Sequence, residues 1–98
     1  KSLGVPGALK SVLTASDAKT AFIYGPYVDN TNLPSLDLFV VSDSNHIRKT
    51  FDDVEKRFGR GINLTLMSLS DYKSKKKSGE RHLKKLLNTK KILLMGRL

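Results

Sequence analysis

Four short, largely apolar segments most tightly constrain how this chain can fold. They cover residues 21–24, 36–41, 62–66 and 92–95, and turn-forming residues stand beside them. Short segments of this composition are typical of strands in a sheet, and the third, which alternates apolar and polar residues, indicates a strand with one polar face. Because a chain of 98 residues has room for one domain with one core, we expect these strands to belong to a single sheet.

The stretch between the second and third segments has the spacing of an amphipathic helix. Ile47, Phe51, Val54 and Phe58 follow one another at intervals of three or four residues. That spacing puts all four side chains on one helix face and predicts a buried face for a helix over residues 45–58.

The remaining helical signals complete the order α-β-β-α-β-α-α-β. A first helix is expected over residues 6–15, and two short helices separated by Gly79 are expected between the third and fourth strands. The strand–helix–strand unit over residues 36–66 predicts a right-handed parallel crossover, and the loop before it predicts an antiparallel first pair. We therefore predict an α+β domain over residues 1–98, with a small mixed sheet of about four strands and helices packed on it.

The positive charge is confined to the C-terminal part of the chain. Residues 1–72 hold eight basic and eight acidic side chains, whereas residues 73–98 hold ten basic side chains and one acid, Glu80. Such a block indicates a polyanionic partner (DNA, RNA, an anionic membrane surface or an acidic protein) or a solvated helix face. Its candidate polyanion-binding residues are Lys73, Lys75, Lys76, Lys77, Arg81, Lys84 and Lys85.

Residue types that are rare or missing exclude several functional classes. Without cysteine the chain has no disulfide, no thiolate zinc site and no cysteine nucleophile. Two histidines, His46 and His82, are too few for a multi-histidine metal site. No apolar run approaches a membrane span and no signal peptide is visible, so we expect a cytoplasmic protein without a membrane partner. Because the sequence opens at Lys1 rather than Met, we expect a domain cut from a longer chain.

Two stretches together resemble the core of minimal nucleotidyltransferase domains of the polymerase-beta-like superfamily. They read Ala-Phe-Ile-Tyr-Gly-Pro over residues 21–26 and Ser-Leu-Asp-Leu-Phe-Val-Val over residues 35–41. The family pattern is an apolar strand, Gly-Ser, a loop and then Asp-x-Asp with apolar residues. Residues 61–66 and 90–96 resemble the third and closing strands of that family. Residues 3–9 resemble the segment that joins such a domain to an N-terminal winged-helix domain in prokaryotic transcriptional regulators, which implies that partner.

The resemblance implies a site for Mg²⁺ and a nucleoside triphosphate. Two carboxylates at positions i and i+2 of a strand project from the same face. With a third from the neighbouring strand, they can hold two divalent ions that bind the phosphates and stabilise charge during in-line transfer. The family glycine lets the backbone approach the phosphates, and the serine hydroxyl can contact them.

This chain departs from the family pattern at most of the positions that carry the chemistry. Gly25 is kept, but Pro26 stands in place of the serine, which removes a hydroxyl and a backbone N–H. Ser35 stands in place of the first aspartate, and Asn63 in place of the third carboxylate. Asp37 is thus the one retained carboxylate and the candidate catalytic and metal residue. The resemblance implies that Gly25, Pro26, Ser35 and Asn63 are the remnant of a nucleotide site. Serine and asparagine are weak neutral ligands for Mg²⁺.

Three functions stay open at this point. The first is a catalytically degenerate domain, a pseudoenzyme, that acts as a regulatory, ligand-binding or interaction module; it needs no cofactor unless the remnant site still binds Mg²⁺ and a nucleotide. The second is an active Mg²⁺-dependent transferase with an altered metal shell around Asp37. Asp29 and Asp43 could supply charge to that shell, although their positions favour a turn and a helix cap. The third is a nucleic-acid-binding module that uses the basic block. Asp37 also has a structural alternative, as a strand residue bonded to nearby backbone or to a basic side chain.

Overall fold

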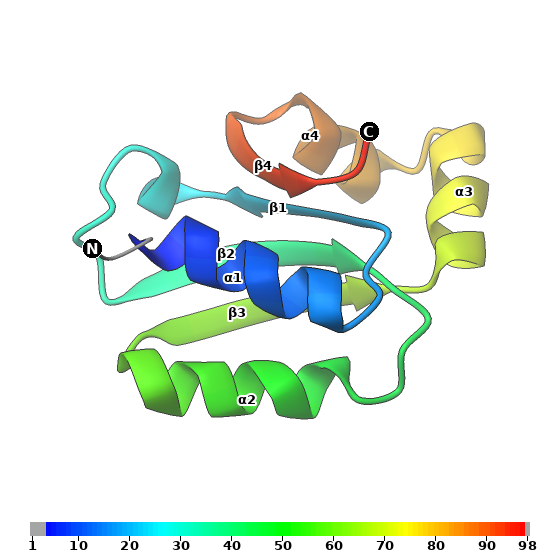
Figure 1. Cartoon of the computed structure of the whole chain (residues 1–98). Coiled ribbons are helices and arrows are strands. Elements are labelled where there is room, and N and C mark those ends of the chain that lie inside the picture. The colour runs from blue at the N-terminus through cyan, green and yellow to red at the C-terminus, as the bar shows by residue number, and fades with distance from the viewer. Residues whose placement is uncertain (1–3, 98) are drawn as a thin grey trace.

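The computed structural model describes residues 4–97 and has the element order expected from the sequence (Figure 1). Its elements are α1 (Gly4–Ala15), β1 (Thr20–Tyr24), the single 3₁₀ turn η1 (Pro26–Val28), β2 (Ser35–Val41), α2 (Ile47–Phe58), β3 (Gly61–Met67), α3 (Leu69–Ser78), α4 (Arg81–Asn88) and β4 (Lys91–Met95). The α+β class is confirmed, and η1 was not expected. Of the segment that resembles a domain junction, Leu3 and the side chains of Val5 and Pro6 lie outside the described residues. Within residues 4–97 none of the helices has the length and apolar character that crossing a bilayer requires.

The four strands form one mixed sheet in the order β3-β2-β1-β4. The expected antiparallel pairing of β1 with β2 and parallel pairing of β2 with β3 are both confirmed. Asp37 of β2 lies between its register partners, Tyr24 of β1 and Asn63 of β3. The order puts β4 antiparallel to β1 at the edge, a position that the sequence analysis did not predict.

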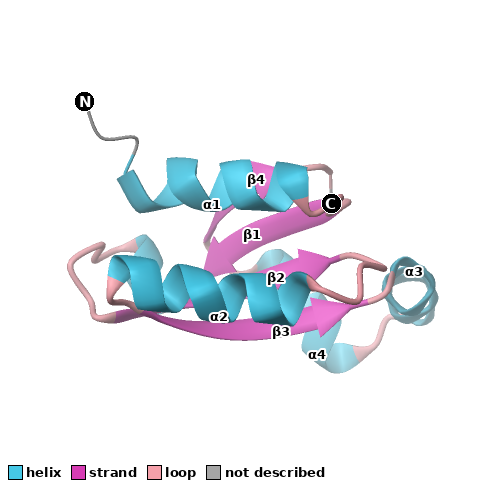
Figure 2. Cartoon of the chain, turned by 60° about the horizontal axis from the view of Figure 1, so that its bottom comes forward, coloured by secondary structure: helices cyan, strands magenta, loops and turns pink. Residues whose placement is uncertain are grey.

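Helices cover both faces of the sheet. α1 and α2 lie on one face, and α4 lies on the other (Figures 1 and 2). Leu36, Leu38 and Val40 of β2 belong to the first core with α1 and α2, whereas Phe39 and Val41 belong to a second core with α3 and α4. This two-sided burial explains why β2 is a continuous apolar run over most of its length.

The first polar side chains of β2 lie on the face of the sheet that carries the second core. Ser35 is exposed and Asp37 is half-buried. Because alternate strand residues share a face, both lie on the same side as Phe39 and Val41. The fold therefore leaves polar side chains accessible at one end of this face.

Two local predictions around α2 are wrong. Phe58 is 39% exposed although its spacing placed it in the core, because it is the last residue of α2 and the chain turns away at left-handed Gly59. The N-cap residue of α2 is His46, whose side chain makes no capping hydrogen bond. Asp43 instead accepts a hydrogen bond (3.2 Å) from the backbone N–H of Leu69, the first residue of α3. Parallel β2 and β3 end at the same edge, which brings the residues after β2 beside the start of α3.

Candidate functional site

The first candidate site lies where β1 ends and where β2 and β3 begin. We call it the strand-end site, and it consists of Gly25, Pro26, Ser35, Asp37 and Asn63. All but the glycine line a hollow of about 300 Å³. A Cβ atom on Gly25 would collide with the carboxylate of Asp37. The structure therefore brings together all five residues that the sequence singled out, and Leu33 and Pro34, which it did not single out, complete part of the wall.

Asp37 is held by the residue that stands opposite it on β3. Its Oδ1 accepts a hydrogen bond of 3.0 Å from Nδ2 of Asn63. The structural alternative expected from the sequence for Asp37 is a bond to backbone or to a basic side chain, whereas the observed partner is a neutral amide. Asn63, at the position of the third family carboxylate, thus donates to Asp37 instead of adding a second negative charge.

The basic side chains near the hollow bind the segment between β1 and β2. Nη1 of Arg60 donates to the backbone carbonyl oxygens of Thr31 and Leu33, at 3.1 and 2.7 Å. Nζ of Lys90 lies 2.6 Å from Oδ1 of Asp29 in an exposed ion pair. The two candidate substitutes for the missing ligands, Asp29 and Asp43, therefore have other partners, and neither lines the hollow.

The strand-end site does not fit a two-metal nucleotide centre. Such a centre needs several carboxylates from adjacent strands, and here Asp37 is the single carboxylate among the lining residues. Pro26 supplies neither a hydroxyl nor a backbone N–H. Over residues 4–97 no three histidine or acidic side chains gather closely enough to hold a metal ion. The residues present offer a polar hollow that carries one negative charge.

Gly25 is a position of this site where the backbone and the space around it both disfavour a side chain. Its φ of 79° and ψ of −164° belong to a backbone region open essentially only to glycine. We expect Gly25→Ala to lower the free energy of unfolding by about 1–3 kcal/mol, as measured by urea denaturation. Part of this loss should be recovered in the double variant with Asp37→Ala, because the added methyl group would then meet no carboxylate.

Gly59→Ala is the matched control for this substitution. Gly59 also has a positive φ, of 65°, but a Cβ atom there meets nothing within 4 Å. We expect it to show the backbone cost alone, about 1–2 kcal/mol, with no recovery when Asp37→Ala is added. Equal behaviour of the two glycine variants would show that Asp37 does not pack against Gly25.

The second candidate site is the outer surface of α3 and α4. We call it the basic surface, and all its members are exposed: Lys73, Lys75, Lys76, Lys77, Arg81, Lys84 and Lys85. On α4, Arg81, Lys84 and Lys85 occupy positions i, i+3 and i+4, which share one helix face. The buried Leu83 and Leu86 lie on the other face, against the second core. The basic residues predicted from composition are thus exposed on two consecutive helices that contact each other.

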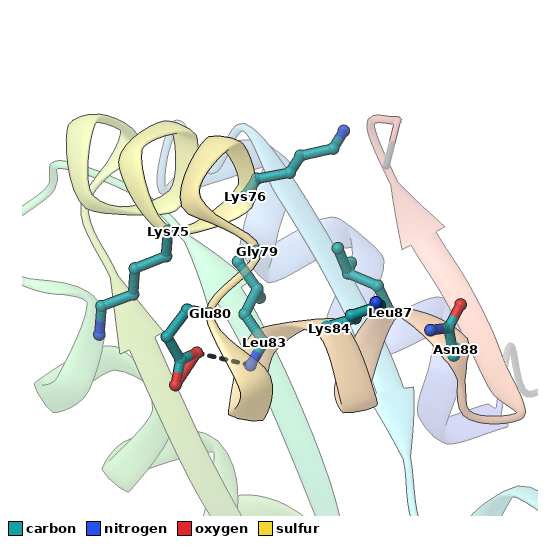
Figure 3. A pocket seen from close by; sticks show the side chains of 8 residues that line it. All are labelled: Lys75, Lys76, Gly79, Glu80, Leu83, Lys84, Leu87 and Asn88. Atoms are coloured by element: carbon teal, nitrogen blue, oxygen red, sulfur yellow. Dashed lines mark hydrogen bonds between the residues drawn. The ribbon is translucent and has the colours of Figure 1, made fainter.

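A groove of about 290 Å³ runs between α3 and α4 within this surface (Figure 3). The side chains of Lys75 and Lys76 leave α3 in opposite directions, and Lys84 lines the groove from α4. Leu83 and Leu87 supply its apolar part. The sequence predicts a helix over these leucines, but it does not indicate a groove, because the groove depends on how α3 packs against α4.

Glu80 is the one acid between residues 73 and 98, and it caps α4. Its carboxylate accepts hydrogen bonds from the backbone N–H of Leu83 (2.7 Å) and of His82 (3.1 Å). The hydrogen bond from Leu83 is the largest cause that lowers the pKa of Glu80 from its ordinary 4.5, and the charge of Lys75 adds to it. Because the pKa is lower in the folded state, ionised Glu80 stabilises the protein above pH 4.5. This stabilisation is lost as the pH falls through the folded pKa.

Replacing the Glu80 carboxylate by an amide should change the stability of the protein by an amount that depends on pH. We expect Glu80→Gln to be less stable than the wild type at about pH 7, and we expect this difference to be smaller at about pH 3, because the wild-type carboxylate is protonated as the pH falls through its folded pKa. Thermal unfolding at the two pH values measures the difference. A loss of stability that is the same at both would show that the charge of Glu80 does not stabilise α4.

Comparison with known proteins identifies no relative of this chain. No protein-family model, no curated protein and no solved structure matches the chain. The likeness to nucleotidyltransferases rests on the sequence pattern alone and stays a hypothesis.

Proposed function

We propose that this chain is a catalytically degenerate nucleotidyltransferase-like domain that acts as a regulatory or interaction module. The observation that carries the proposal is the Asn63–Asp37 hydrogen bond. It occupies an oxygen of the one carboxylate in the strand-end site and puts an amide donor where a transferase needs a further carboxylate. Ser35, on the same strand face, adds only a neutral hydroxyl.

The charges around the hollow favour a module that works without a bound nucleotide. Among the described residues that line it, none is lysine or arginine. Phosphate oxygens would meet the negative charge of Asp37 without a basic side chain in the lining to offset it. Arg60, which lies nearby, donates to loop carbonyls. We therefore include in the proposal that neither Mg²⁺ nor a nucleoside triphosphate is a resident cofactor.

The proposal extends to the setting in which the domain works. The likeness of residues 3–9 to a domain junction supports an N-terminal winged-helix partner in a prokaryotic transcriptional regulator, and with it a cytoplasmic location. In that setting the domain would regulate the protein by contacting another domain or another protein, and it would not transfer nucleotides.

A label-transfer assay tests this function against the active alternative. The protein is incubated with Mg²⁺ or Mn²⁺ and each α-labelled nucleoside triphosphate, in the presence of protein and RNA acceptors. We expect transfer no greater than that of the Asp37→Asn variant, with an active transferase as positive control. Metal-dependent transfer that disappears in Asp37→Asn would overturn the proposal and establish an enzyme with an altered metal shell.

A further inference from the structure

The basic surface plays no part in the strand-end site, and its charges need their own explanation. Between residues 73 and 98 the chain has ten basic residues and one acid. That acid, Glu80, directs both carboxylate oxygens at backbone N–H groups of α4. We propose that the basic surface of α3 and α4 binds the phosphate backbone of double-stranded DNA.

The arrangement of the charges favours a polymer over a single small anion. A small anion is best held by donors that converge on one point, whereas Lys75 and Lys76 extend in opposite directions (Figure 3). On α4 the basic side chains follow one helix face. Charges spread over two helices match a partner that carries a row of phosphates, whose condensed counterions are released on binding.

The side chains between the lysines favour a duplex over a single strand. Binding of single strands draws much of its affinity from bases that stack on exposed aromatic rings. Tyr72 is the only phenylalanine, tyrosine or tryptophan of α3 and α4, and it is 6% exposed because it packs in the second core beside Phe39. The bases of a duplex are already stacked, so a surface that contacts phosphates is sufficient.

The chemistry of the same surface favours DNA over a membrane. Duplex RNA is recognised largely through its 2′-hydroxyls together with its phosphates, whereas contacts to phosphates alone are sufficient for non-specific binding to duplex DNA. Membrane-surface helices insert large apolar side chains. The exposed large apolar side chains among the described residues are Phe58 and Leu93, and neither lies on α3 or α4.

The opposite side of the molecule carries no comparable excess of charge. α2 combines Arg48, Lys49, Lys56 and Arg57 with Asp52, Asp53 and Glu55. The electrostatic potential of the protein is therefore asymmetric, and it would orient α3 and α4 towards a polyanion during the encounter. Contacts with phosphates carry little sequence information, so binding should be weakly sequence-specific.

Fluorescence anisotropy with a labelled DNA duplex tests this inference. The surface variant carries Lys75→Gln, Lys84→Gln and Lys85→Gln, which remove charge and keep most of each aliphatic stem. The control variant carries Lys10→Gln, Lys49→Gln and Lys56→Gln, which remove the same charge from exposed positions on α1 and α2. Circular dichroism verifies that both variants fold.

We expect wild-type binding that weakens steeply between about 50 and 200 mM salt. The surface variant should lose at least about tenfold in affinity, and its salt slope should fall by about 0.9 for each phosphate contact removed. The control variant should keep most of the affinity. Equal losses in the two variants, or no wild-type binding at the lowest salt, would overturn the proposal. Tighter binding to single-stranded DNA, duplex RNA, polyglutamate or anionic vesicles would overturn it equally, while leaving the strand-end proposal untouched.

Discussion

The double variant Ser35→Asp with Asn63→Asp is expected to bind Mn²⁺ and, without the ion, to be less stable than the wild type by about 2 kcal/mol. The substitutions would put two further carboxylates beside Asp37, on the same face of β2 and on its register partner in β3. They would also remove the amide that now donates to Asp37. A hydrogen bond to a charged group contributes about 1.5–3 kcal/mol, and repulsion between the carboxylates adds to its loss.

The ion should reverse this loss. A ligand present at 100 times its dissociation constant stabilises the folded state by about 2.7 kcal/mol, so saturating Mn²⁺ should return the variant to about wild-type stability. Urea denaturation with and without MnCl₂ measures the effect. The control variant Ser11→Asp with Asn45→Asp adds the same charge at separate exposed positions. Its free energy of unfolding should not increase when MnCl₂ is added. An equal increase in the stability of the wild type on addition of MnCl₂ would show that its own site already binds the ion.

The second large effect is expected in the core beneath the basic surface. Phe39→Ala should lower the free energy of unfolding by about 3–5 kcal/mol. Phe39 is fully buried, stacks on Phe22 with ring centroids 5.0 Å apart, and lies 6.1 Å from the ring of Tyr72 in α3. The substitution removes contacts that join β2 to β1 and to α3, and it leaves a cavity between them.

Phe58→Ala is the matched control for this prediction. Phe58 is 39% exposed at the end of α2, so its truncation should change the free energy of unfolding much less, by about 0.5 kcal/mol. Urea denaturation of both variants compares the same chemical change at a buried and at an exposed position. Similar losses would contradict the assignment of Phe39 to the second core.

Most of the fold could be predicted because the local patterns agree with the tertiary structure. The run over residues 38–41 is apolar on both faces, and this part of β2 is covered on both faces. The edge position of β4 could not be predicted, since nothing local in a short apolar strand specifies its neighbour. Phe58 was misplaced because helical spacing assigns a face and does not indicate where that face stops being covered.

The strand-end site could be predicted in part for the same reason. Spacing puts Ser35 and Asp37 on one face, and a parallel crossover brings β3 beside them. That Asn63 donates to Asp37 follows from the register between the two strands, which the sequence does not indicate. The groove between α3 and α4 likewise depends on the packing of two separate helices.

Isothermal titration calorimetry of the wild-type protein with Mg²⁺-ATP and Mg²⁺-CTP tests the central claim most directly. The strand-end site has one carboxylate, held by Asn63, and no lysine or arginine among its described lining residues. We therefore predict no saturable heat from this site, and the same trace for the Asp37→Asn variant. Saturable, Mg²⁺-dependent binding that is lost in Asp37→Asn would contradict the claim and identify the domain as a nucleotide-binding one.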